Sequence, residues 1–161
     1  MTFQTASKTL VIGLGNPILT DDAAGIKVAR ALRAGPLPAG VDVAELSVGG
    51  LALMEAMVGY DRAVLIDAIK TRGGAPGQVY TLALDDLPGT LNTASAHDVN
   101  LPTALATGRR LGAPLPEDAD IHIIAIEAED VLTFGEQCTP AVEAAIPVAA
   151  RRVLALLQSF A

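Results

Sequence analysis

One short segment near the start of the chain constrains the fold most strongly. The apolar run Thr9–Gly13 leads through Gly15 and Asn16 to the acidic pair Asp21 and Asp22, which an amphipathic stretch follows. A strand, a glycine-containing loop and a helix in this order are typical of the first unit of a parallel α/β sheet. Such sheets keep their ligand sites at the carboxyl ends of the strands. Two acidic side chains at that place favour a cation over a phosphate group.

The rest of the chain continues the alternation of short apolar runs and helix-like stretches. We expect strands at Thr9–Gly13, Val41–Leu46, Ala63–Ile66, Val79–Leu84 and Asp120–Ile126, and helices at residues 23–33, 51–58, 99–111 and from Thr139 onward. Neither a long linker nor an internal repeat divides residues 1–161. The pattern predicts one α/β domain, a mostly parallel twisted sheet of about five strands with helices on both faces.

Two of these elements carry more detailed predictions. The run Ala63–Ile66 is wholly apolar, so we expect it to be the most central strand and the shortest, ending where Asp67 follows. Pro147 lies inside the apolar stripe of the last helix. Because proline lacks an N–H and its ring clashes with the preceding turn, we expect that helix to be kinked or split.

Composition and charge limit the class of protein. The formal net charge is −7, which argues against a nucleic-acid partner because phosphate binding needs clustered Lys and Arg. Half of the residues are apolar (51%), yet no uninterrupted apolar run reaches the roughly 18 residues that a membrane helix needs. Cys138 is the only cysteine, so no internal disulfide can form. We therefore expect a soluble cytoplasmic enzyme.

Three polar residues fall where the predicted fold has its functional edge: Asp22 after the first strand, Asp67 after the central strand, and His97 in a loop before a helix. Two carboxylates and one imidazole suit zinc, nickel or iron, and three protein ligands leave positions for water or substrate. A structural alternative stays open for each residue. Asp21 and Asp22 can serve a helix start, Asp67 can cap a turn, and His97 can be an exposed loop residue.

A second acidic group follows the last predicted strand and consists of Glu127, Glu129 and Asp130. Acidic runs of this kind are usually exposed to solvent, although one member can help to shape a cleft. A dinucleotide site is disfavoured at the first loop, because the third glycine of the G-x-G-x-x-G pattern is missing and aspartates stand where a pyrophosphate would bind.

Several of these segments together resemble a known family. The pattern Gly15-Asn16-x-x-x-x-Asp21-Asp22-x-x-Gly25 is similar to the first motif of the nickel–iron hydrogenase maturation endopeptidases. The segments Leu65-Ile66-Asp67-Ala68, His97-Asp98-Val99-Asn100-Leu101 and Cys138-Thr139-Pro140 resemble three further motifs of that family. Asn100 replaces the usual glycine after the histidine, and of the family's glycine-rich segment only the last glycine is clearly kept in Leu46-Ser47-Val48-Gly49-Gly50.

The resemblance implies an endopeptidase that removes a carboxyl-terminal extension from a hydrogenase large-subunit precursor. The family's metal-binding positions fall on Asp22, Asp67 and His97 of this sequence. In that family the nickel is carried by the precursor and serves as the recognition element, although a site of this type can also take zinc. Either the metal or one of the candidate catalytic carboxylates, Asp22 or Asp67, can activate the attacking water.

Two alternatives come from other classes of protein. A non-catalytic metal-binding maturation chaperone could use the same three ligands. A peptidyl-tRNA hydrolase-like esterase is suggested by Gly13-Leu14-Gly15-Asn16-Pro17, but no histidine follows closely and the acidic charge is unsuited to tRNA. The sequence has neither H-E-x-x-H nor G-x-S-x-G, which disfavours the common zinc-protease and serine-hydrolase mechanisms.

Overall fold

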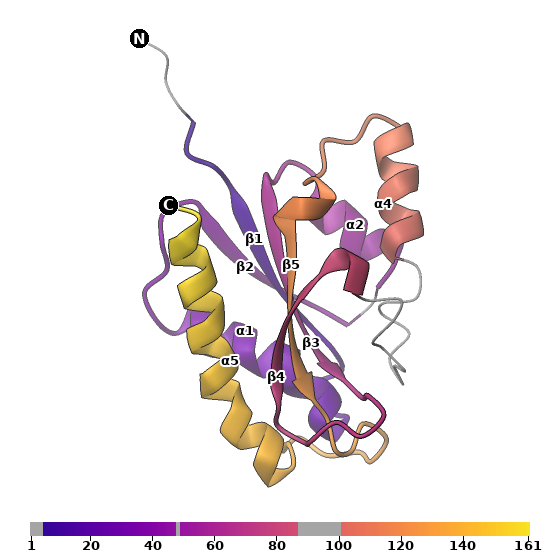
Figure 1. Cartoon of the computed structure of the whole chain (residues 1–161), viewed down its shortest axis with the longest axis vertical. Helices are drawn as coiled ribbons and strands as arrows, with labels where there is room; N and C mark the ends of the chain where they lie inside the picture. The colour runs from indigo at the N-terminus through magenta and orange to yellow at the C-terminus, as the bar shows by residue number, and fades with distance from the viewer. Residues whose placement is uncertain (1–4, 48, 87–100) are drawn as a thin grey trace.

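Five strands form one sheet in the computed structural model, which describes residues 5–47, 49–86 and 101–161 (Figure 1). The strands are β1 (Thr9–Leu14), β2 (Val41–Leu46), β3 (Arg62–Ile69), β4 (Val79–Ala83) and β5 (Ile121–Glu127). Their order in the sheet is β2-β1-β3-β5-β4, and only β4 runs antiparallel to its neighbour. The predicted fold class, a mostly parallel α/β sheet, is confirmed.

Strand β3 lies at the centre of the sheet, as predicted, but its predicted length was wrong. It spans eight residues, Arg62–Ile69, and is the longest of the five strands rather than the shortest. Asp67 does not end it, because the ladder with β5 continues from the pair Asp67 and Ala125 to the pair Ile69 and Glu127. Strand pairing uses backbone groups, so one buried carboxylate does not interrupt it.

Two layers of helix cover the two faces of the sheet (Figure 1). Helices α1 (Ala24–Arg33) and α5 (Pro140–Ser159) pack on one face, and α2 (Leu51–Met57) and α4 (Leu101–Arg110) pack on the other. Successive residues of β1 alternate between the layers: Leu10 and Ile12 join the α2 and α4 side, and Val11 joins the α1 and α5 side. Burial on both faces explains why β1 reads as a continuous apolar run.

Helix α5 continues through Pro147 as one helix, so of the two predicted outcomes, a kink or a split, the split was wrong. Pro147 is exposed, whereas Val142, Ile146, Ala149 and Val153 of the predicted stripe are buried against the sheet. Packing on both sides of the proline therefore holds the two halves in one helix, at the cost of the backbone hydrogen bond that proline cannot make.

The length of the β3–β4 connection explains the direction of β4. Residues 70–78 link β3 to β4, which is too short for the crossover that a parallel neighbour would need, and β4 accordingly runs antiparallel at the edge. The other predicted strand and helix bounds agree within one or two residues. The loop predicted over Asp85–His97 begins within the 3-10 helix η2 (Leu84–Asp86), and its remaining residues and the first two of the predicted helix at 99–111 lie outside the described residues. In the part of the chain that is described, no helix is long and apolar enough to span a membrane.

Candidate functional site

The connection from β1 to α1 is built on glycines because the backbone segments are in direct contact. Gly15 has a φ of 139°, and a Cβ atom there would lie 1.8 Å from the carbonyl oxygen of Asp22. A Cβ atom at Gly25 would lie 2.2 Å from the carbonyl oxygen of Ile66 and 2.4 Å from that of Leu14. The short 3-10 helix η1 (Thr20–Ala23) is thereby held against the carboxyl-terminal half of the central strands.

Asp22 and Asp67 come from two elements that contact each other, η1 and β3. Asp22 is 8% exposed, and its Oδ2 accepts the backbone N–H of Asn16 at 2.9 Å. Asp67 is 2% exposed, and its Oδ1 accepts the N–H of Ala68 at 2.8 Å. Within the described ranges Asp22 forms no ion pair with Lys or Arg. Two nearly buried carboxylates therefore lie on elements that contact each other, and a buried carboxylate needs hydrogen bonds or a balancing charge.

The third residue of the predicted metal set, His97, lies outside the described residues. Among the residues that are described, no group of three or more His, Cys, Asp or Glu side chains has a metal-binding arrangement. The structure therefore describes Asp22 on η1 and Asp67 within β3, and the complete set with His97 stays a prediction.

Asp21, the neighbour of Asp22, has a structural role that the sequence pattern did not reveal. Its carboxylate is fully buried and accepts the backbone N–H groups of Glu129 and Asp130 at Oδ2, both at 2.9 Å, and that of Thr139 at Oδ1, at 2.7 Å. The Thr139 hydroxyl lies within 3.0 Å of both carboxylate oxygens. Asp21 thus joins η1 to the loop before α5 instead of capping its own helix.

Glu127, Glu129 and Asp130 have three different environments. Glu127 is buried, so the expectation of solvent exposure was wrong for it: its Oε2 accepts the Thr71 N–H at 2.9 Å, and its Oε1 accepts the hydroxyls of Thr71 and Tyr80. Glu129 is exposed. Hydrogen bonds from Thr133 and Leu132 hold the pKa of the Asp130 carboxyl below its usual range. Glu127 therefore supports the β3–β4 connection, and Asp130 organises the following loop.

The environment of Cys138 does not activate its thiol as a nucleophile. It is buried beside the carbonyl oxygen of Thr20, with the Sγ and O atoms 3.5 Å apart. Burial raises the pKa of this thiol to about 11. Because the thiolate is the nucleophilic form, a thiol with so high a pKa stays unreactive near neutral pH.

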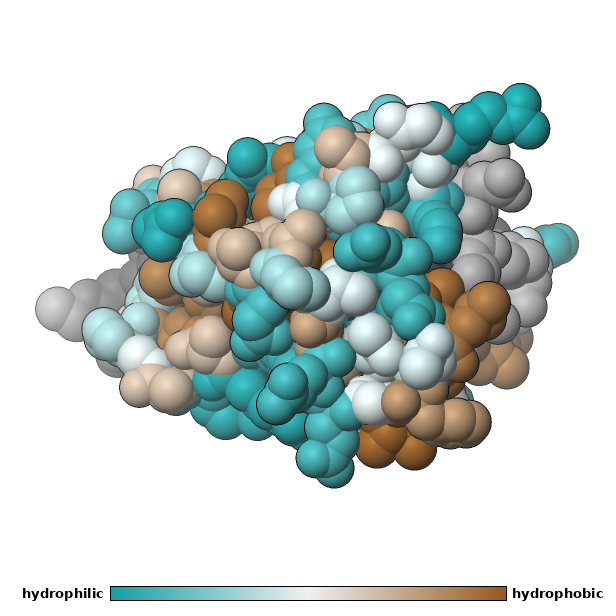
Figure 2. All heavy atoms as spheres, turned by 90° about the horizontal axis from the view of Figure 1, so that it is seen from below, coloured by the Kyte–Doolittle hydropathy of each residue, from teal (hydrophilic) through white to brown (hydrophobic). Residues whose placement is uncertain are grey.

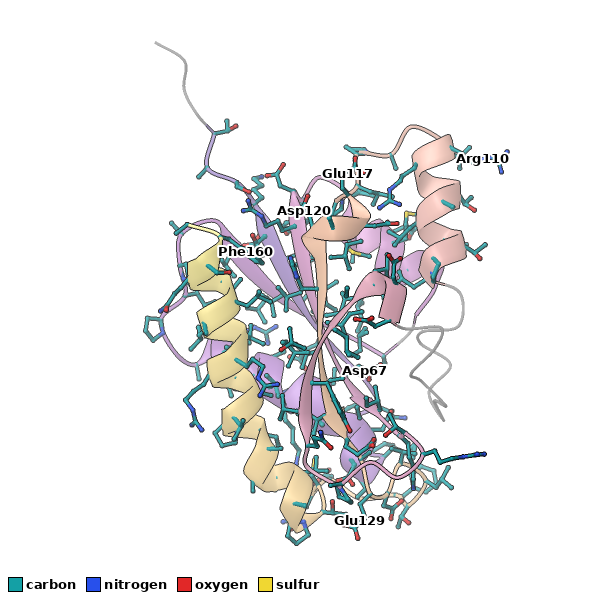
Figure 3. The ribbon with its side chains drawn as sticks, viewed as in Figure 1. Asp67, Arg110, Glu117, Asp120, Glu129 and Phe160 are labelled. Carbon is teal, nitrogen blue, oxygen red and sulfur yellow. The ribbon has the colours of Figure 1, made fainter. Side chains whose placement is uncertain are left out.

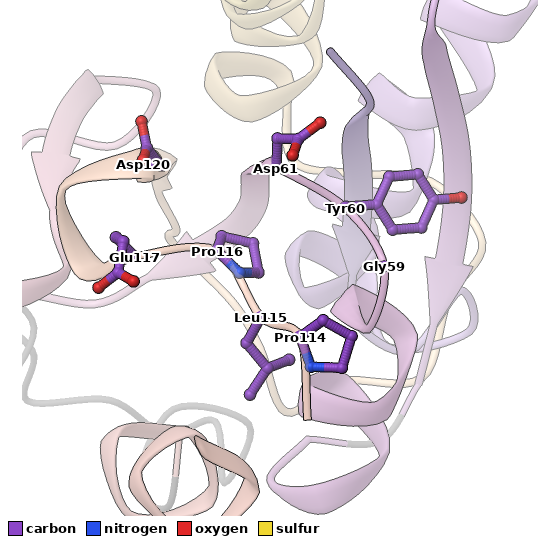
Figure 4. Close-up of a pocket in the computed structure, with 8 residues that line it drawn as sticks. All are labelled: Gly59, Tyr60, Asp61, Pro114, Leu115, Pro116, Glu117 and Asp120. Carbon is purple, nitrogen blue, oxygen red and sulfur yellow. The ribbon is translucent and has the colours of Figure 1, made fainter. Parts of the chain in front are cut away.

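The cavities described by the structure do not coincide with Asp22 and Asp67. One, of about 320 Å³, lies at the amino-terminal end of β3, between the α2–β3 and α4–β5 connections (Figure 4). It is lined by Gly59, Tyr60, Asp61, Pro114, Leu115, Pro116, Glu117 and Asp120. Figure 3 shows Glu117 and Asp120 at the upper end of the molecule and Glu129 at the lower end, with Asp67 between them. A second hollow, of about 520 Å³, lies between the first turns of α2 and α4.

Comparisons with known proteins agree on one family. The hydrogenase maturation protease family model matches residues 26–156. The Hydrogenase 2 maturation protease of Escherichia coli (strain K12) is 30% identical over 94% of this chain and 91% of its own length. The structure of the hydrogenase maturating endopeptidase HybD from E. coli superposes with a TM-score of 0.80 at 31% identity, covering 94% of this chain and 93% of that one. The [NiFe] hydrogenase maturation protease HybD from Thermococcus kodakarensis gives a TM-score of 0.68 at 28% identity, covering 93% and 99% of the two chains.

Proposed function

We propose a specific activity for this chain, which belongs to the hydrogenase maturation protease family: it removes the carboxyl-terminal extension of a nickel-loaded hydrogenase large-subunit precursor. The family supports an endopeptidase, because the matched relatives are maturation proteases and endopeptidases. The precursor as the protein substrate and the cleaved tail are the specific parts of the proposal.

The pair of nearly buried carboxylates at Asp22 and Asp67 is the observation that carries this proposal. A buried carboxylate needs hydrogen bonds or a balancing positive charge, and a bound cation is one way to supply that charge. Asp22 uses Oδ2 for the Asn16 N–H, so its Oδ1 is available to a cation. In the proposed complex Asp22, Asp67 and His97 bind the nickel ion that the precursor carries. Carboxylate and imidazole groups are suitable ligands for this ion.

Nickel bound in this way would place the scissile peptide bond beside the two carboxylates. The ion can polarise the carbonyl group as a Lewis acid, and Asp22 or Asp67 can accept a proton from the attacking water. A precursor without nickel offers no positive charge to the site. We therefore expect cleavage only of the loaded precursor, because only that form gains the favourable interaction with the protease.

The test is to incubate the purified protein with nickel-loaded and nickel-free precursor and to follow the shortening of the precursor by mass spectrometry. We expect cleavage of the loaded form alone, and loss of cleavage in Asp22→Asn, Asp67→Asn and His97→Ala. Asp118→Asn is the matched control, because Asp118 is an exposed aspartate at the opposite end of the sheet.

Each alternative predicts a different result. A chaperone would bind the precursor and leave its tail intact. Equal cleavage of loaded and nickel-free precursor would refute the role of nickel while leaving the protease activity in place. Full activity of Asp22→Asn and Asp67→Asn would show that the active site lies elsewhere.

A further inference from the structure

Three apolar side chains are exposed at the end of the sheet that carries Asp22. Leu132 is 81% exposed, Phe134 is 78% exposed, and Ile18 is 48% exposed. We call these three residues the loop patch. The chain has three Phe, two Tyr and no Trp, so aromatic residues are few. One of them, Phe134, nevertheless has most of its side chain exposed. Figure 2 views the molecule from this end and shows hydrophobic side chains reaching the surface among polar ones.

The members of the loop patch come from two backbone segments that pair with each other. The N–H of Gly135 donates to the carbonyl oxygen of Ile18 at 2.9 Å, and the N–H of Thr20 donates to the carbonyl oxygen of Gly135 at 3.0 Å. Phe134 directly precedes Gly135, and Leu132 lies two residues before Phe134. The patch is therefore a local cluster formed by two connections, β1–η1 and β5–α5, and not a set of scattered side chains.

The loop that carries Leu132 and Phe134 is held in one conformation. Asp21 accepts the N–H groups of Glu129 and Asp130 at its start and that of Thr139 at its end. Asp130 Oδ1 in turn accepts the N–H of Leu132 at 2.9 Å. The exposure of Leu132 and Phe134 is thus built into a well-bonded loop. A rigid surface loses little conformational entropy on binding, which favours its use as a docking surface.

The charge around the loop patch indicates the kind of partner. Residues 128–139 contain Glu129, Asp130 and Glu136 but no Lys, Arg or His. The side chain of Lys70 reaches this loop at the carbonyl oxygen of Glu129. An apolar centre bordered by acidic side chains fits a protein surface with apolar residues bordered by Lys or Arg. A symmetric contact between two copies would instead bring the same acidic loops together.

We propose that Ile18, Leu132 and Phe134 dock the folded body of the protein substrate beside the cleavage site. The inference rests on the proposed function, because it takes the hydrogenase large-subunit precursor as that substrate. The same segment carries Ile18 of the patch, the anchoring residue Asp21 and the site residue Asp22. A precursor bound to the patch therefore has its adjoining tail close to Asp22. Docking at this surface adds affinity for the whole precursor and leaves the chemical step unchanged.

The test compares a double variant, Leu132→Ala with Phe134→Ala, with the control Leu111→Ala. Leu111 is 82% exposed but follows α4, at the other end of the molecule. With nickel-loaded precursor, we expect KM of the double variant to rise about 10- to 30-fold, the usual loss for an aromatic anchor, while kcat changes little. The control should keep the KM of the original protein. Unchanged circular dichroism and urea midpoints should accompany these values, because the replaced side chains are exposed.

A direct measurement of precursor binding tests this inference independently of the proposed function. If the unaltered protein binds the precursor but does not cleave it, the proposed function fails, and the dissociation constants of the same variants still test the docking surface. An unchanged dissociation constant and KM in the double variant would overturn the docking proposal even if cleavage is confirmed. Sedimentation that shows a dimer dissociated by the double substitution would assign the patch to a second copy and would also overturn it. Glu136→Lys should weaken precursor binding and reduce its dependence on salt.

Discussion

The adjacent aspartates Asp21 and Asp22 should respond in opposite ways to the same conservative change. Asp21→Asn replaces one carboxylate oxygen with an amino group in a site that offers three backbone N–H donors and a hydroxyl. Whichever way the amide is oriented, its amino group faces at least one of these donors. Asp22→Asn keeps an acceptor for the single N–H of Asn16. The structure therefore predicts a large loss of stability for the first variant and a small one for the second.

The magnitude for Asp21→Asn follows from the number of donors. One buried N–H left without an acceptor costs about 1–3 kcal/mol, and the remaining hydrogen bonds lose the extra strength that a charged acceptor provides, about 1 kcal/mol each. We expect the free energy of unfolding to fall by about 3–5 kcal/mol, a large part of the roughly 5–15 kcal/mol that holds a domain together. For a chain of this size the melting temperature should drop by about 10 °C. Asp22→Asn should cost less than about 1 kcal/mol.

The first measurement is urea denaturation of the original protein and both variants, monitored by circular dichroism. The second is cleavage of nickel-loaded precursor at a temperature where all three proteins are folded. Equal slopes of unfolding free energy against urea would show that the variants unfold from comparable states. We expect Asp22→Asn to be stable and inactive. Asp21→Asn should be unstable but should retain activity while it is folded.

Two results would refute this reasoning. A loss below about 1 kcal/mol in Asp21→Asn would mean that the hydrogen bonds to the β5–α5 loop contribute little to stability. Full cleavage by Asp22→Asn, with Asp21→Asn folded and inactive, would show that the roles of the two residues are reversed.

Three further predictions concern other parts of the chain. Cys138→Ser should cleave the precursor normally, and Cys138 in the folded protein should react slowly with a thiol reagent at pH 8, because burial raises the pKa of the thiol to about 11. Gly25→Ala should lower the free energy of unfolding by about 3 kcal/mol in urea denaturation, since its Cβ atom would lie 2.2 Å from the carbonyl oxygen of Ile66. Burial lowers the pKa of His122, and the charge of Arg62 adds to this while Asp120 opposes it. The unfolded chain therefore takes up this proton first, so stability should fall as the pH drops below about 6.5, and urea midpoints at pH 5 and pH 8 should differ less in His122→Gln.

Much of the fold could be predicted from the sequence because its signals are local. Strand β1 is a continuous apolar run because both of its faces are buried, and the first turn of α5 is marked by Thr139 and Pro140. The position of β3 at the centre of the sheet followed from the wholly apolar run Ala63–Ile66 within it. Its length did not, because backbone pairing with β5 carries the strand past Asp67. The side chain of a single residue says little about where a backbone ladder ends.

The candidate site, like the fold, could be predicted from the sequence only in part. Local patterns predicted that Asp22 follows β1 and that Asp67 ends β3; the structure places Asp22 on η1 and Asp67 within β3, and these two elements contact each other. Only the tertiary structure distinguished Asp21 as an anchor, since its hydrogen-bond partners lie 108 to 118 residues further along the chain. Glu127 was equally hidden in an acidic run, because its partner Thr71 is 56 residues away. A carboxylate's role depends on the donors that surround it in space, and folding alone brings those donors to it.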